Sequence, residues 1–247
     1  MNYLFSLWGM LLLMSLSCGG QVLEEAVFAE RLSYRQSSFD VVRLDSPDQL
    51  QFFSRNEQGE PFTDFQALET SVARRGKKLL FATNGGIFEP DFHPSGLYVE
   101  DGNLITPLNQ KAGKGNFYLE PNGVFYIGET EKNILTTAEY AQQKPKAKQA
   151  IQSGPMLVIE GKIHPRFNEG SPNRYVRSGV GIDTEGRIWL AISNEPVNLY
   201  HFASLFKERL SCPNALYLDG AISQMYLPQL GRKDKGRQYG SLLVISQ

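Results

Sequence analysis

Three apolar runs in this chain each adjoin a polar side chain that is followed by glycine. They are LLFATNGG at 79–86, AIQSGPMLVI at 150–159 and ALYLDG at 215–220. A run of this kind predicts a buried strand whose end presents a polar side chain, where glycine lets the backbone approach a ligand closely. We therefore expect Asn84, Ser153 and Asp219 to meet at one site, provided that the fold brings the three strand ends together.

The pattern from residue 78 onward predicts short strands joined by hairpins. The dipeptides that supply the positive φ angles of tight turns are Asp101-Gly102, Asn122-Gly123, Glu160-Gly161 and Glu185-Gly186. Earlier strands are predicted at 39–44 and 50–53, and a last one at 241–246. Residues 135–149, which contain the charged run KPKAK, are predicted to form a solvated connection.

Two amphipathic helices are predicted beside the strands. In the first, over 63–75, Thr63 and Gln66 form a capping-box pattern and Gly76 is placed to end the helix. In the second, over 198–210, Asn198 is placed to cap a stripe of apolar residues. The pattern predicts an α+β fold, with a largely antiparallel or mixed sheet packed by a few amphipathic helices.

The N-terminus has the features of an export signal. Residues 3–14 form an apolar run too short to cross a membrane comfortably, and small residues and Cys18 follow it. MSLSC resembles a relaxed bacterial lipobox, although no Lys or Arg precedes the apolar run; a plain cleaved signal peptide or a misassigned start codon are the alternatives. We expect a leader at 1–18, a linker at 19–38 and one domain at 39–247. The expected location is the periplasm or outer membrane, with a lipid anchor on Cys18.

Composition narrows the class of protein. The 247 residues include 25 basic and 26 acidic side chains, so nothing favours a polyanionic partner, and we exclude nucleic-acid binding. Of the two cysteines, Cys212 is alone once Cys18 is assigned to lipidation. The chain therefore lacks a disulfide framework and a metal-type Cys/His spacing. No cofactor is required by the sequence, and a requirement for a divalent cation stays open.

The order of five segments resembles the phosphodiester glycosidase domain family, most closely its compact bacterial members. The segments are NGGIFEPDFHPSGLYVEDG, GNFYLEPNGVFYIG, SGPMLVIEGKIHPRF, RSGVGID and ALYLDGAISQMY. This family includes the mammalian uncovering enzyme, N-acetylglucosamine-1-phosphodiester alpha-N-acetylglucosaminidase. The resemblance covers roughly residues 75–246. It implies a hydrolase that removes a sugar from a sugar 1-phosphodiester.

The resemblance also implies roles for the strand ends. Asn84 corresponds to an asparagine that lines the family's active site, with Gly85 and Gly86 admitting the sugar phosphate. From the residues alone, Asn-Gly favours a hairpin turn. The step from Gly154 to Pro155, which follows Ser153, corresponds to one that borders the pocket, although a simple turn would have the same sequence.

Arg177 and Asp219 are the two charged candidates. Arg177 occupies an R-x-x-G-like position of the family, and a guanidinium offers a planar fork of donors to phosphate oxygens; Arg174 is the competing choice. Asp219 and Gly220 match the family's Asp-Gly, with a turn or N-cap aspartate as the alternative. The small residues that usually follow are replaced here by Ala221 and Ile222. Ser223 is then the expected polar contact of that loop.

Other titratable residues stand near the motifs. His93 is the only histidine inside a site motif, and we expect it at the rim of the pocket as a substrate contact. The identity of the carboxylate that acts with Asp219 stays open, and the candidates are Asp91, Glu89 and Glu195.

The predicted partner is a small sugar phosphodiester or an envelope glycan. Two other classes stay open. One is a non-catalytic envelope lipoprotein that binds a sugar phosphate. The other is a phosphodiesterase that attacks phosphorus, although such enzymes usually need metal ions and more ligands than three scattered histidines provide.

Overall fold

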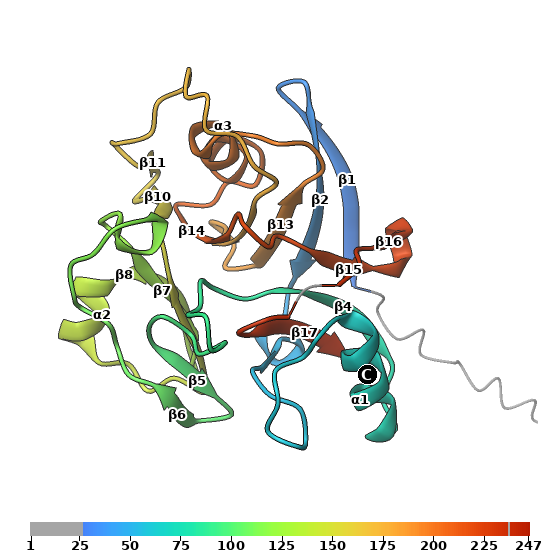
Figure 1. The fold of residues 1–247 in the computed structure, drawn as a ribbon. Coiled ribbons are helices and arrows are strands. Elements are labelled where there is room, and N and C mark those ends of the chain that lie inside the picture. The colour runs from blue at the N-terminus through green and yellow to red at the C-terminus, as the bar shows by residue number, and fades with distance from the viewer. Residues whose placement is uncertain (1–26, 237) are drawn as a thin grey trace, which may run out of the picture.

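The computed structural model describes residues 27–236 and 238–247, whose strands form three antiparallel sheets (Figure 1). The predicted α+β class is confirmed. The first sheet contains, in spatial order, β1 (Phe28–Tyr34), β2 (Ser37–Leu44), β13 (Ile188–Ser193), β12 (Ser178–Ile182), β14 (Asn214–Asp219), β10 (Met156–Ile159) and β11 (Lys162–Ile163). The second contains β16 (Arg232–Lys233), β15 (Met225–Leu227), β4 (Leu79–Asn84), β17 (Leu242–Ser246) and β3 (Gln51–Phe53). The third contains β6 (Asn103–Thr106), β5 (Tyr98–Glu100), β9 (Gln149–Ser153), β7 (Gly123–Ile127) and β8 (Lys132–Thr136).

The three sheets share one apolar core. Buried side chains from each sheet, such as Val180, Phe81 and Phe125, belong to the same cluster. In β14, Leu216 faces this shared core, while Tyr217 belongs to a second cluster on the other side of the sheet. The alternation follows from the period of two along a strand. Both faces of β14 are therefore buried, which explains its nearly continuous apolar sequence.

Each sheet has a helix packed on its other face (Figure 1). The helices are α1 (Phe65–Arg74) on the second sheet, α2 (Thr137–Gln143) on the third and α3 (Leu199–Ser204) on the first. A π-helical segment, η3 (Leu205–Arg209), continues α3. Single 3-10 turns are η1 (Pro47–Gln49), η2 (Asn116–Tyr118) and η4 (Pro228–Leu230). The helices therefore cover the outer faces, while the inner faces of the three sheets form the shared core.

The predicted N-cap of the first helix is wrong. Asp64, and not Thr63, caps α1, because its carboxylate accepts the Ala67 N–H at 2.8 Å. Gly76 follows α1 with a φ of 73°, as its predicted role requires. Asn198 caps α3 as predicted, accepting the His201 N–H at 2.8 Å.

Three of the four hairpin dipeptides are confirmed. Asp101-Gly102 joins β5 to β6 with φ angles of 48° and 79°, and Glu160-Gly161 joins β10 to β11 with angles of 48° and 75°. Gly186 has a φ of 78° between β12 and β13. Asn122-Gly123 is not a hairpin turn. The Asn122 side chain is buried and donates to Phe117 O at 2.9 Å, while Gly123 begins β7.

Two segments predicted to lack regular structure contain elements. The linker predicted at 19–38 includes β1, whose polar sequence reflects an edge strand with little burial. The connection predicted at 135–149 includes α2, which begins with a capping box between Thr136 and Glu139. Only the lysine-rich stretch after α2 is a coil.

The leader predicted at 1–18, with Cys18, lies outside the described residues. Within the part of the chain that is described, we find no helix with the length and apolar character needed to traverse a bilayer.

Candidate functional site

The structure brings the ends of β4, β9, β12 and β14 together. Asn84 donates through Nδ2 to Ser178 Oγ at 2.9 Å, and Ser178 stands opposite Asp219 in the pairing of β12 with β14. Ser153 Oγ donates to Leu218 O at 2.9 Å, which ties the end of β9 to β14. We call Asn84, Ser153, Ser178, Asp219 and Ser223 the strand-end cluster. Residues more than 60 positions apart in the sequence become neighbours here because three sheets end at one place.

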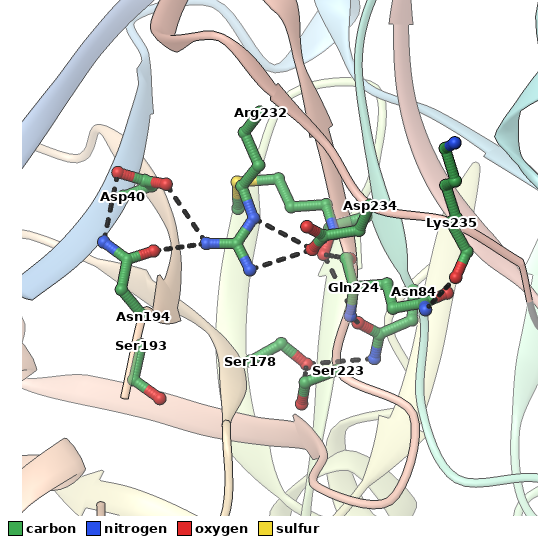
Figure 2. Close-up of polar contacts among 12 residues, drawn as sticks. Asp40, Asn84, Ser178, Ser193, Asn194, Ser223, Gln224, Arg232, Asp234 and Lys235 are labelled. Carbon is green, nitrogen blue, oxygen red and sulfur yellow. Dashed lines mark hydrogen bonds and ion pairs between the residues drawn. The ribbon is translucent and has the colours of Figure 1, made fainter. Parts of the chain in front are cut away.

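Asn84 is completely buried, and both ends of its amide are engaged (Figure 2). Nδ2 also donates to Gly85 O at 3.0 Å, and Oδ1 accepts the Gln224 N–H at 3.1 Å. These partners fix the orientation of the amide and join β4 to β12 and to the segment before β15. The contacts indicate that Asn84 orders the site.

Asp219 places a carboxylate at the end of β14 with only 7% of the residue exposed. Oδ1 accepts the Gly220 N–H and, at 2.7 Å, the Ala221 N–H. Burial raises the pKa of this carboxyl above its ordinary value, against the opposing effect of the backbone N–H groups of the turn. Ser223 Oγ donates to Asp219 O and lies 3.2 Å from Ser178 Oγ, so the turn folds back onto the cluster. Ser223 is thus in contact with Asp219, and its predicted role as a substrate contact stays a prediction.

Arg177 differs from what the sequence predicted. We expected a guanidinium free to receive a phosphate, but the side chain is 1% exposed and bonded to the protein. Nε donates to Val197 O at 2.7 Å, Nη1 to Tyr217 Oη at 3.0 Å, and Nη2 to Asn173 Oδ1 at 2.8 Å. Burial lowers the pKa of the guanidinium, with Tyr217 opposing the shift. The competing Arg174 is exposed at the surface.

The glycines of the motifs lie against protein atoms. A Cβ atom at Gly85 would stand 2.1 Å from Ser241 Oγ, and one at Gly154 would stand 2.7 Å from Asn122 Cβ. One at Gly86 would meet Ser153 Cβ at 3.1 Å. The strand ends therefore approach one another more closely than larger residues would permit.

The model of the phosphodiester glycosidase family matches residues 77–245 of the chain. The chain belongs to this family. The uncharacterized protein YigE of Escherichia coli (strain K12) is 34% identical over 180 residues, which are 73% of this chain and 70% of YigE. The catalytic domain of zebrafish N-acetylglucosamine-1-phosphodiester alpha-N-acetylglucosaminidase, solved in a form auto-inhibited by its pro-peptide, matches with a TM-score of 0.62. That match is 18% identical and covers 89% of this chain and 81% of the zebrafish chain, so it shows a common fold.

The other titratable residues of the phosphodiester glycosidase motifs make contacts of their own. His93 is mostly exposed, with Nδ1 3.2 Å from Asp91 Oδ2. Glu89 accepts Ser95 Oγ at 2.7 Å, and Glu195 accepts the Ser38 N–H at 2.8 Å. The structure therefore connects none of Asp91, Glu89 and Glu195 to Asp219 through these hydrogen bonds. Within residues 27–236 and 238–247 we also find no group of three His, Cys, Asp or Glu side chains arranged to hold a metal ion.

A polar network beside the strand-end cluster was missed by sequence reasoning (Figure 2). The Gln224 side chain donates to Lys235 O at 2.8 Å and accepts the Tyr239 hydroxyl. Asp234 Oδ2 accepts the Met225 N–H at 2.9 Å and pairs with Arg232 Nη2 at 2.8 Å. The network holds β15 and β16 next to Asn84. The polar stretch after β15 was the available signal, but the pattern of apolar residues does not predict its contacts.

The arrangement offers a buried carboxylate next to hydroxyl and amide groups whose positions are fixed. Such a carboxylate can stabilise positive charge that develops nearby, accept a proton from water or act as a nucleophile. Each of these is a role that a carboxylate takes in cleavage at an anomeric carbon: base in an inverting reaction, nucleophile in a retaining one, and stabiliser of the oxocarbenium-like transition state.

Proposed function

We propose that this protein hydrolyses a sugar 1-phosphodiester at the anomeric carbon, and that Asp219 is its catalytic carboxylate. The observation that carries the proposal is the buried Asp219 at the meeting point of four strand ends, in a chain of the phosphodiester glycosidase family. The name of the zebrafish enzyme of the same fold makes an N-acetylglucosamine 1-phosphodiester the first substrate to test.

The chemistry suits a site with few charged groups. The leaving group is a phosphomonoester with a second pKa of ~6, so it departs without strong help from a general acid. The sugar passes through an oxocarbenium-like transition state, which the Asp219 carboxylate stabilises. Water then supplies the oxygen of the new anomeric hydroxyl, and the phosphate keeps its bridging oxygen.

The decisive experiment follows isotopically labelled water into the products. The purified protein is incubated with a synthetic N-acetylglucosamine 1-phosphodiester in ¹⁸O water. We expect free sugar that carries ¹⁸O at the anomeric carbon and a phosphomonoester without label. Label in the phosphate would identify attack at phosphorus. Saturable binding without release of either product would identify a binding protein.

Location is a separate proposal, supported by the sequence of residues 3–18. We propose that the chain is exported and lipidated on Cys18. Cys18→Ala is expected to move the protein from the membrane fraction to the soluble fraction of the cell envelope, as judged by immunoblotting. Cys212→Ala is the matched control, because Cys212 is buried in the domain and should not affect the distribution. Membrane association that persists in the Cys18 variant would refute lipidation.

A further inference from the structure

Tyr217 touches the turn that follows Asp219. A Cβ atom at Gly220 would lie 1.9 Å from Tyr217 Oη, closer than such atoms can approach. The tyrosine side chain is completely buried in the apolar cluster that packs α3 on the first sheet, so its ring cannot swing out to make room. The hydroxyl therefore acts as a fixed support against the Gly220 backbone.

Arg177 determines where this hydroxyl lies. Its Nη1 donates to Tyr217 Oη at 3.0 Å, and the guanidinium carbon lies 5.4 Å from the centroid of the tyrosine ring. Val197 and Asn173 hold the other nitrogens of the guanidinium. Charge-assisted hydrogen bonds with fixed geometry make the cation a rigid element. The packed ring and this cation together fix the position of Oη.

The orientation of the Asp219 carboxylate depends on the same turn. The N–H groups of Gly220 and Ala221 both converge on Oδ1. A displacement of the Gly220 backbone moves both donors, and the carboxylate moves with them. A misplacement of about 1 Å in a reacting group costs roughly 10²-fold in rate.

We propose that Tyr217 and Arg177 are a pair of positioning residues that set the orientation of the Asp219 carboxylate through Gly220. The proposal rests on the proposed function of Asp219. It gives Arg177 a supporting role in place of the phosphate ligand that its sequence suggested. Tyr217 acts through its hydroxyl, which contacts the turn and not the substrate.

The test is a double-mutant cycle on Tyr217 and Gly220. Gly220→Ala is expected to lower kcat by about 10²-fold, because the new methyl group pushes the turn away from Oη. Tyr217→Phe alone is expected to lower kcat, because it removes the hydroxyl that accepts a hydrogen bond from Arg177. Added to Gly220→Ala, the same change removes the clash and is expected to raise kcat by about tenfold, within the coupling range of contacting residues. With Phe at 217 the nearest ring carbon would stand 3.2 Å from the Cβ atom, a tight contact that permits partial recovery.

A second readout does not depend on turnover. In ¹³C-labelled protein, an NMR titration of the Asp219 carboxyl should show its pKa displaced by Gly220→Ala and returned toward the wild-type value in the double variant. Gly170→Ala is the matched control, because a Cβ atom there would meet only Asn168 Oδ1 at 3.6 Å. If the pKa displacements of the two single variants simply add in the double variant, the proposed positioning pair is overturned. Recovery in the titration by a protein that cleaves no sugar phosphodiester supports the pair and refutes the proposed function.

Discussion

Asp219→Asn is expected to lower kcat on a sugar 1-phosphodiester by about 10²- to 10⁴-fold while the protein stays folded. The substitution removes the negative charge that faces the oxocarbenium-like transition state. It keeps a carbonyl oxygen at the position of Oδ1, which accepts the Gly220 and Ala221 N–H groups. Steady-state release of free sugar measures the loss. Substrate binding should be preserved, because the change removes no donor to the phosphate.

The stability of this variant distinguishes a catalytic aspartate from a structural one. Burial raises the pKa of Asp219 in the folded protein, so protonation of this carboxyl stabilises the fold below its ordinary pKa of ~3.9. That stabilisation is lost as the pH rises through the folded-state pKa. An asparagine resembles the protonated form, so the variant should unfold at a temperature no lower than wild type at neutral pH. In the wild type, the acid limb of kcat/KM should lie above the ordinary aspartate pKa.

Asp183→Asn is the matched control for Asp219→Asn. Asp183 is also a buried aspartate that follows a strand and accepts turn N–H groups, and it pairs with Arg187 at 2.7 Å. Burial would raise its pKa, but hydrogen bonds from Trp189 and Arg187 outweigh that effect and lower the pKa. This variant should lose stability and keep kcat. Full activity in Asp219→Asn would exclude the catalytic assignment, and Glu195 and Asp91 would be tested next.

Local sequence signals predicted those parts of the fold that short-range chemistry decides. Gly102 and Gly161 adopt the positive φ angles that a hairpin needs, and Asn198 caps a helix through residues only three positions away. The errors fall where tertiary context decides. The β1 strand has a polar sequence because it pairs at a sheet edge, and Asn122 enters a buried contact with Phe117 in place of a turn.

The residues of the candidate site also fall into those that local sequence predicts and those that it does not. Asn84, Ser153 and Asp219 end apolar strands, and that pattern is visible in the sequence. Ser178 and Tyr217 were missed because their roles come from register: Ser178 stands opposite Asp219, and Tyr217 lies two residues before it on the same strand. The buried hydrogen bonds of Arg177 depend on Val197 and Asn173, which no local pattern connects to a strand end. The pairing of residues on different strands and loops therefore could not be predicted from the sequence.

Asp40→Asn is expected to lower the free energy of unfolding by about 1–3 kcal/mol, the usual cost of losing charge-assisted hydrogen bonds to a buried carboxylate. Asp40 is completely buried on β2, where Arg31 Nε lies 2.7 Å from Oδ1. Arg232 Nη1 lies 3.1 Å from Oδ2 (Figure 2). Arg232 is nearly buried as well, so the variant leaves its charge without this partner. Denaturant unfolding measures the effect. Asp45→Asn is the control, because Asp45 is largely exposed beside Arg43 and should cost about 1 kcal/mol or less.

The pH dependence of stability gives an independent check on Asp40. Burial alone would raise the pKa of this carboxyl, but hydrogen bonds from Arg31, Arg232 and Asn194 outweigh it and lower the pKa. A lowered pKa stabilises the fold above the ordinary aspartate value of ~3.9, and this contribution disappears as the pH falls through the folded-state pKa. Asp40→Asn should therefore flatten the decline of wild-type stability in acid. Arg232 also holds Asp234, whose carboxylate accepts the Met225 N–H. Met225 follows Gln224, whose N–H donates to Asn84. The variant should therefore also disturb this contact of Asn84 and lower turnover. A decline in acid as steep as that of wild type would show that Asp40 is not the group that titrates.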